Sequence, residues 1–262
     1  MQSSNPAFRG LGGPVVAGKA QPAPSADYLK KMFDQPSYQA PPTERVLTLD
    51  DVVTRTAIVL GTGIVAAVAT MYFTSTWALA IPALIVGLVL SLIIIFKRST
   101  NPALILSYAV AEGVLLGAIT AAFQSLPGYQ GIGLQALVGT LGVFAGMLVV
   151  YKTGAIRVTP KFTKFMVGAM IGVLVLVVFR LLASAFGFAQ GMSNGGPLSI
   201  VISLAIIAFA ALSFLLDFDQ IDRAIKAGVP ARTSWYFAFS LMVTLVWLYL
   251  EILRLLGALR SD

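Results

Sequence analysis

A small set of ionisable residues interrupts the apolar runs of this sequence, and these residues are its main candidates for chemistry. They are Glu112, Arg180, Asp217, Asp219 and Glu251. A charged side chain is costly in the hydrocarbon of a bilayer, so an ionisable residue at that depth usually has a task. Carboxylates there are suited to bind or pass a cation, to carry a proton, or to neutralise a buried base.

Arg180 and Glu251 are predicted to form a structural ion pair. They lie about fifteen and sixteen residues into apolar runs that are expected to cross the membrane in the same direction, so at about 1.5 Å per residue they reach similar depths. Arg254 is a competing partner, because it follows Glu251 by three residues on the same helix face.

Glu112 and Asp217 are the carboxylates predicted to shape an ion pathway. Glu112 has no basic residue at its own depth, so it is either protonated or faces a polar cavity. Thr244 and Gln135 are candidates for lining that cavity. Asp217 lies near the cytoplasmic end of its run and is expected to face the interior, where it would bind or gate a cation.

Asp219 is a secondary candidate for the same pathway. Residues two apart on a helix point about 200° apart, so Asp217 and Asp219 cannot both face one site. The alternative for Asp219 is an ion pair with Arg223, four residues later, on a solvated helix end.

Several classes of activity are excluded by the residue types. The chain has no His and no Cys, which removes Ser-His-Asp sites, HExxH zinc sites and thiolate ligands. An aspartate protease would need a second aspartate deep in another run, and no Walker-type loop for a nucleotide is present. We therefore expect no enzymatic activity, no metal centre and no cofactor. The basic residues are scattered beside apolar runs, so nucleic acid is not an expected partner.

These residues must be positioned by transmembrane helices. Of the 262 residues, 58% are apolar and 11% are charged, against about 25% charged in a soluble domain. Runs of about 20 apolar residues suit helices that cross a bilayer. The sequence predicts an all-α polytopic membrane protein, a bundle of seven transmembrane helices, at residues 52–73, 77–96, 103–123, 131–150, 165–188, 197–216 or beyond, and 235–256.

Two parts of the chain differ in composition. Residues 1–45 are rich in Pro, Gly, Ser and Ala and contain no long apolar run, so we predict a disordered cytoplasmic tail. Residues 46–262 are the predicted transmembrane domain.

The distribution of basic residues predicts the orientation. Loops two, four and six between the predicted spans hold nine Lys and Arg residues, and loops one, three and five hold none. The positive-inside rule then places the N-terminus in the cytoplasm of a cell with the protein in its plasma or inner membrane. Seven spans leave the C-terminus outside, whereas a re-entrant last segment would leave it inside. The nine residues are Lys97, Arg98, Lys152, Arg157, Lys161, Lys164, Arg223, Lys226 and Arg232.

Pairs of glycines at four-residue spacing predict close helix contacts within the bundle. They are Gly113 and Gly117, Gly142 and Gly146, and Gly168 and Gly172.

The sixth and seventh runs resemble the Bax inhibitor-1 family of seven-helix membrane proteins. The segments that carry the resemblance are Phe214-Leu-Leu-Asp-Phe-Asp-Gln-Ile, Ala238-Phe-Ser-Leu-Met-Val-Thr and Tyr249-Leu-Glu-Ile-Leu-Arg-Leu-Leu, with support from Ala111-Glu-Gly-Val-Leu-Leu-Gly and Thr140-Leu-Gly-Val-Phe-Ala-Gly. The opening Ser3-Ser-Asn-Pro-Ala-Phe is similar to a bacterial branch of that family.

The resemblance implies a function for Asp217. Bacterial members are known as pH-sensitive calcium leak channels, whose sensor is a pair of aspartates in the sixth and seventh spans. Asp217 matches the first aspartate, and Thr244, which cannot ionise, falls at the second position. Glu112 is then the better candidate for a second carboxylate. Other members suggest the alternative, a non-transporting regulator that binds another membrane protein such as a quality-control protease. A proton-coupled carrier is a third hypothesis.

Overall fold

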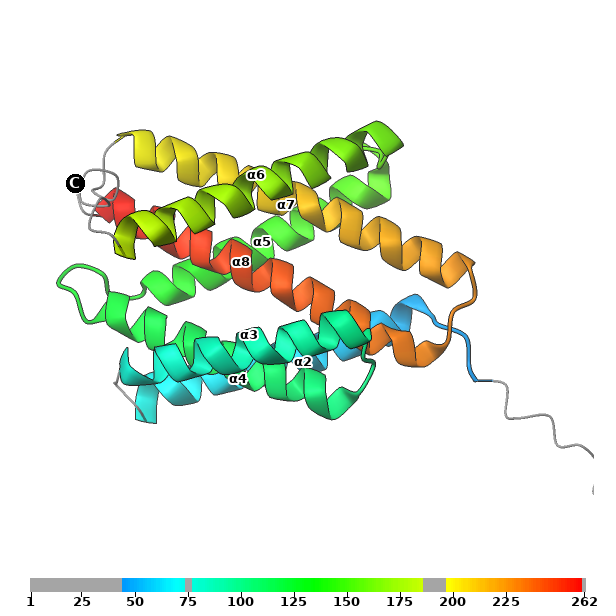
Figure 1. Cartoon of the computed structure of the whole chain (residues 1–262), viewed down its shortest axis with the longest axis horizontal. Coiled ribbons are helices and arrows are strands. Elements are labelled where there is room, and N and C mark those ends of the chain that lie inside the picture. Colours follow the sequence, from blue (N-terminus) through cyan, green and yellow to red (C-terminus); the bar gives the residue numbers. More distant parts are fainter. Residues whose placement is uncertain (1–43, 74–76, 186–196, 261–262) are drawn as a thin grey trace, which may run out of the picture. The chain divides into compact units, whose positions relative to one another are not determined.

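The computed structural model describes residues 44–73, 77–185 and 197–260, apart from some side chains at the ends flanking 186–196 (Figure 1). These ranges contain seven α-helices and two short 3-10 helices. The α-helices are α2 (Leu49–Phe73), α3 (Ala80–Lys97), α4 (Pro102–Gln124), α5 (Ile132–Thr153), α6 (Pro160–Ala185), α7 (Pro197–Lys226) and α8 (Ser234–Arg260), and the 3-10 helices are η2 (Trp77–Leu79) and η4 (Ala231–Thr233). The predicted tail up to residue 43 lies outside the described residues.

Six helices of the described chain are long and apolar enough to cross a membrane, by length and composition. They are α2, α3, α4, α5, α7 and α8. The helix α6 lies where the fifth span is predicted, but it is not among these six. The all-α class and the polytopic character are supported, and the count of seven spans stays a prediction.

Local sequence signals explain most helix ends. Thr48 caps α2, since its hydroxyl accepts from the Asp51 amide at 3.3 Å and its own amide donates to the Asp51 carboxylate at 3.1 Å. Asn101 caps α4 by accepting from the Ala103 amide at 3.0 Å. At the end of α5, Gly154 adopts a left-handed conformation, φ 68°, which glycine tolerates best.

The end of α7 differs from the prediction. The apolar run ends near residue 216, but the helix continues to Lys226. Two pairs at four-residue spacing support the extra turns: Asp219 with Arg223 at 2.8 Å and Asp222 with Lys226 at 2.5 Å. The predicted long loop 217–234 is therefore mostly helix, and Asp217 lies inside α7 instead of at its end.

The helix α8 lies at the centre of the bundle and contacts α2, α4, α5 and α7, while α6 packs against α7 (Figure 1). Two buried hydrophobic clusters meet on α8. One joins α5, α7 and α8 around Phe214 and Leu248, and the other joins α2, α3, α4 and α8 around Ile94 and Phe239. Because α8 belongs to both clusters, its polar residues are held between the two halves of the bundle.

The first predicted glycine pair forms a close contact between α4 and α2. A Cβ atom on Gly113 would lie 2.3 Å from the Gly63 carbonyl oxygen, and one on Gly117 would lie 2.4 Å from the Ala67 carbonyl oxygen. Only glycine allows these backbones to approach so closely. The other two pairs, on α5 and α6, have open space where a Cβ would lie, so they form no such contact in the described part of the chain.

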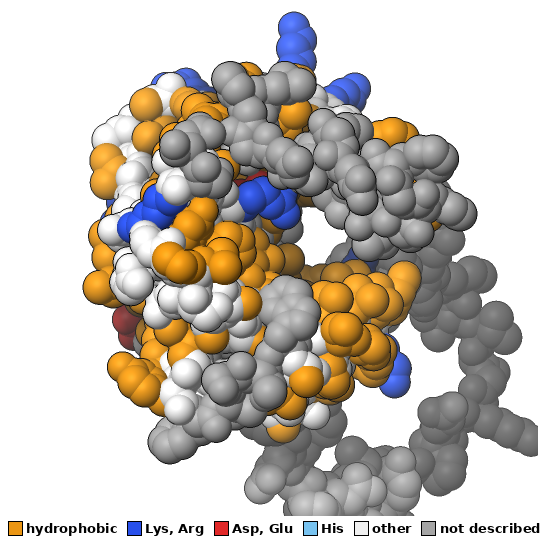
Figure 2. Space-filling model, turned by 90° about the vertical axis from the view of Figure 1, so that its left-hand side faces the viewer, with side chains coloured by type: hydrophobic (Ala, Val, Ile, Leu, Met, Phe, Trp, Pro, Cys, Tyr) orange, Lys and Arg blue, Asp and Glu red, His pale blue; other side chains and the backbone are white. Residues whose placement is uncertain are grey.

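Large apolar side chains cover the outside of the bundle. Val65 on α2, Phe96 on α3 and Leu174 on α6 are 69%, 81% and 61% exposed. Figure 2, which shows one end of the bundle, has hydrophobic patches among polar atoms, with a few Lys and Arg side chains beside them. A water-soluble protein rarely exposes such a surface, whereas a bilayer requires it.

The segment before α2 lies along the connection between α7 and α8. Val46 and Pro230 form an isolated antiparallel bridge, and the Leu47 amide donates to the Val229 carbonyl at 2.8 Å. Arg55, near the start of α2, donates to the Ser234 hydroxyl at the start of α8. This end of the bundle therefore ties α2 to the α7–α8 connection.

Candidate functional site

Asp217 lies on the face of α7 that packs into the bundle. Phe214, three residues earlier, and Ile221, four residues later, are both buried on this face. The helices α7 and α8 are in contact, and the Asp217 side chain is directed toward α8. The carboxylate is partly buried.

Two hydroxyl groups of α8 donate to Asp217. The Ser240 Oγ lies 2.9 Å from Asp217 Oδ1, and the Thr244 Oγ1 lies 2.8 Å from Asp217 Oδ2. Ser240 and Thr244 are four residues apart, so they share one face of α8. Each carboxylate oxygen thus receives one hydrogen bond, and the two bonds join α7 to α8.

No basic side chain pairs with Asp217 among the described residues. The nearby cations are engaged elsewhere: Arg223 pairs with Asp219 and Lys226 pairs with Asp222, on the same helix. Asp219 therefore adopts the alternative predicted for it, an intrahelical ion pair. Asp217 is left with two neutral donors, which satisfy its hydrogen bonding without cancelling its charge.

Glu112 lies on another side of the bundle. Its Oε1 would be 3.1 Å from a Cβ on Gly87, so the carboxylate is packed against α3, and Tyr108 one turn earlier interacts with it. In the described part of the chain, no hydrogen bond or ion pair joins Glu112 to Asp217 or Thr244. Gln135 is also engaged elsewhere, since its Oε1 accepts from Arg260 Nη2 at 2.8 Å.

Glu251 is buried, 4% exposed, and its carboxylate accepts two hydrogen bonds from Arg254 at 3.0 and 3.2 Å. The competing partner named from the sequence is therefore present. The Arg180 side chain lies outside the described residues, so the predicted Arg180–Glu251 pair stays a prediction.

The donor set around Asp217 differs from that of a stable metal centre. Within the described ranges, no group of three or more Asp, Glu, His or Cys residues could hold a metal ion. One carboxylate and two hydroxyl oxygens do match the oxygen ligands that calcium prefers, but calcium sites that hold the ion use six to eight such ligands. One carboxylate and two hydroxyls are therefore too few ligands to hold a calcium ion by themselves.

The comparison with known proteins identifies the family of the chain. The family model described as Bax inhibitor 1 like matches residues 7–261. The chain belongs to this family. No curated protein matches it in sequence. The resemblance seen in the sequence is thereby confirmed, and it covers nearly the whole of this Bax inhibitor 1 like protein.

Ser240 is the residue of this site that was not predicted from the sequence. The resemblance points to Asp217 and to the seventh-span position occupied by Thr244, and these two side chains are in contact in the structure. Ser240 lies one turn before Thr244 on the same face of the helix. The four-residue spacing of these two hydroxyl residues is the sequence signal that indicates Ser240. The site is a carboxylate held by two hydroxyls.

Replacing Thr244 with Val should destabilise the protein by about 1–3 kcal/mol, because one carboxylate oxygen of Asp217 loses its donor. Thermal unfolding of the purified protein in detergent measures the effect. Thr153→Val is the matched control, since the Thr153 hydroxyl donates only to carbonyls of its own helix and is exposed. Equal shifts for the two variants would contradict a contribution from the α7–α8 hydrogen bond.

Proposed function

We propose that this protein is a leak channel for cations, with calcium as the principal ion, and that Asp217 lies on the permeation path. Family membership supports a channel or regulator role at a coarse level. The observation that carries the finer proposal is the Asp217 carboxylate, which faces two hydroxyls inside a helix bundle without a basic partner among the described residues. Such a group attracts a cation and repels an anion.

The hydrogen bonds of Asp217 also suggest how the path is closed. They join α7 to α8, so these helices must separate or shift before an ion can pass between them. Ser240 and Thr244 then exchange a carboxylate partner for a hydrated cation, whose water ligands their oxygens replace. Protonation of Asp217 would remove its charge, which links permeation to pH through a single carboxyl group.

Glu112 is proposed as a second carboxylate that favours cations, from the α3–α4 side of the bundle. Its packing against Gly87 places it away from the Asp217 hydrogen bonds, so its influence would be electrostatic and longer in range. Glu112→Gln should therefore reduce flux less than a change at Asp217 does.

We propose that the protein lies in the cell membrane with its N-terminus in the cytoplasm and that it is not an enzyme. The supporting observation for the orientation is that the basic residues gather at the helix ends of alternate connections. Lys97 ends α3, Lys152 lies in the last turn of α5, and Lys226 ends α7, all at the same end of the bundle (Figure 1).

The test is a calcium flux assay with the purified protein in liposomes. A dye inside the vesicles reports calcium entry at acidic, neutral and mildly alkaline pH. Protein-containing vesicles should admit calcium faster than empty vesicles, and they should exclude chloride. Flux equal to that of empty vesicles at every pH would refute the channel.

A second function is favoured by the contact of the segment before α2 with the α7–α8 connection. Glu44, at the end of the predicted tail, pairs with Arg232 at 3.2 Å, and Val46 bridges to Pro230. A partner that binds the tail would therefore act on the connection between α8 and α7, the helix that carries Asp217. In this alternative the protein is a regulator of another membrane protein and does not transport ions.

Deleting residues 2–43 distinguishes the two functions. The regulator predicts that cross-linked partner proteins, recovered with the full chain from membranes, disappear with the tail, while calcium flux is absent from both forms. The channel predicts that flux in liposomes persists after the deletion, because the Asp217 contacts lie wholly within residues 44–260. Thermal unfolding of the deleted form checks that the bundle remains intact.

A further inference from the structure

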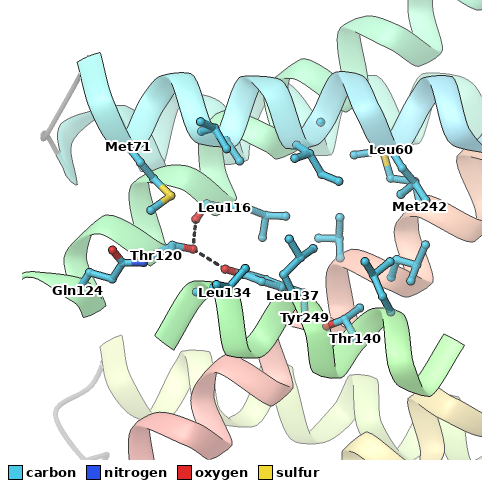
Figure 3. A pocket seen from close by; sticks show the side chains of 18 of the residues that line it. Leu60, Met71, Leu116, Thr120, Gln124, Leu134, Leu137, Thr140, Met242 and Tyr249 are labelled. Carbon is cyan, nitrogen blue, oxygen red and sulfur yellow. Dashed lines mark hydrogen bonds between the residues drawn. The ribbon is translucent and has the colours of Figure 1, made fainter. Parts of the chain in front are cut away.

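A groove of about 420 Å³ lies between α2 and α5, in the half of the bundle away from the α7–α8 connection (Figure 3). Helices α4 and α8 form its floor. Its volume falls in the range of about 300–1,000 Å³ that is typical of sites for small molecules. Most of its lining is apolar, which suits neither a hydrated ion nor a polar metabolite.

The groove opens sideways toward the surrounding lipid. Three of its apolar lining residues also face outward: Ile64 on α2 is 40% exposed, and Leu134 and Leu141 on α5 are 66% and 43% exposed. All three lie within helices that are apolar enough to cross the membrane. A lateral opening at this depth can be filled from the bilayer without passage through water.

The two ends of the groove differ in polarity. Thr120 and Gln124 lie at the end near Met71, close to Tyr249, whereas Leu60 and Met242 form the opposite end (Figure 3). The polar end is the one nearer the α4–α5 connection, because Gln124 is the last residue of α4. This polarity fits an amphiphile whose apolar chain points toward the middle of the membrane.

The hydrogen bonds at the polar end leave one donor group available, the side-chain amide of Gln124. The Thr120 hydroxyl donates to the Leu116 carbonyl at 2.6 Å, so it accepts from the Tyr249 hydroxyl at 2.7 Å. Both hydroxyl protons are therefore used. The Gln124 amide has no hydrogen-bond partner among the described residues, and it lies beside Gly133, where a Cβ would be 3.0 Å from its nitrogen. An acceptor such as an ester carbonyl would satisfy this amide.

A basic side chain contacts the α4–α5 connection, next to the polar end of the groove. Arg260 donates to the carbonyls of Gly128 and Gln130 at 3.0 and 3.3 Å, within the connection that joins Gln124 to the start of α5. An Arg side chain at the membrane surface attracts phosphate groups. The polar end thus offers an amide donor followed, farther out, by a positive charge.

We propose that this groove binds one acyl chain of a membrane phospholipid, with the ester carbonyl at Gln124 and the phosphate toward Arg260. The groove offers an apolar trough, then an amide donor and then a cation. These groups suit, in the same order, the acyl chain, the ester and the phosphate of a phospholipid. The bilayer supplies this ligand at high local concentration. The proposal is independent of cation flux, since none of these residues contacts Asp217.

Native mass spectrometry of the protein, purified from membranes in mild detergent, tests the proposal. The wild-type chain should retain one phospholipid, identified by its mass. Leu137→Trp fills the groove, and Leu134→Trp fills its rim, so each should lower the retained fraction about tenfold, the change expected for about two methylenes that lose their burial. Leu174→Trp on α6 is the matched control, because Leu174 is 61% exposed, like Leu134, but lies outside the groove.

Gln124→Leu gives a second readout, because it removes the amide donor while keeping the apolar trough. It should weaken retention of phospholipid and leave thermal unfolding nearly unchanged. The proposal is overturned if the wild type carries no lipid, if the retained mass is that of a free fatty acid, or if the groove variants and Leu174→Trp retain phospholipid equally.

Discussion

Calcium flux through the reconstituted protein should fall by about tenfold or more when Asp217 is replaced with Asn. The substitution keeps the shape of the side chain and an oxygen that can accept from Ser240 or Thr244, but it removes the negative charge. At about 4 Å and an effective dielectric constant near 20, one unit charge is worth about 4 kcal/mol to a cation, so losing even part of it changes entry by an order of magnitude. The dye-based liposome assay measures the change directly.

Asp222→Asn is the matched control for this result. Asp222 lies on the same helix and near the same end of the membrane, but it is exposed and paired with Lys226 at 2.5 Å. Its removal should leave flux nearly unchanged. If both variants conduct like the wild type, then Asp217 is not on the permeation path, and if both lose flux equally, a general effect of surface charge is responsible.

Asp217→Asn also distinguishes the two proposed functions, the channel and the regulator. A regulator that acts through the tail does not require charge at Asp217, so Asp217→Asn should still recover the same cross-linked partners. A channel loses flux while its fold and partners persist. Measuring flux and co-purification on one preparation therefore separates a loss of function from a loss of structure.

The helices could be predicted from the sequence wherever hydropathy and local caps agree. Asn101 and Pro102 mark the start of α4, and the apolar run defines its length. The end of α7 could not be placed in this way, because hydropathy ends at residue 216 while the Asp219–Arg223 and Asp222–Lys226 pairs continue the helix. A polar helical extension carries no hydropathy signal and is detected only through four-residue charge spacing.

The candidate site was predictable in part. Asp217 and Thr244 were singled out together through the resemblance, and their contact follows from the antiparallel packing of α7 and α8. The direction of Glu112 was not predictable, because the rotation of α4 is set by its glycines against α2, which turn Glu112 toward α3. Depth along a helix can be counted in a sequence, whereas the direction of a side chain depends on which neighbours its helix packs against.

The groove between α2 and α5 could not be predicted from the sequence. Its lining comes from four helices, and each contributes ordinary apolar residues at ordinary spacing. Only Gln124, a polar residue at the end of an apolar run, stood apart, and a helix end is a common place for such a residue. The groove exists because α4 and α8 separate α2 from α5, which is a property of packing.

The largest effect on stability is expected from Gly113→Ala on α4. A Cβ at this position would lie 2.3 Å from the Gly63 carbonyl oxygen and 2.7 Å from the Ala66 side chain, so α2 and α4 must move apart. Such overpacking costs about 1–3 kcal/mol and occasionally more, and here the whole α2–α4 contact is disturbed. Gly142→Ala is the control: no atom lies within 4 Å of its Cβ position, and alanine gains about 1 kcal/mol over glycine in a helix. Thermal unfolding in detergent should therefore shift down for the first variant and stay level or rise for the second. Equal shifts would mean that the glycine contact between α4 and α2 does not hold the bundle together.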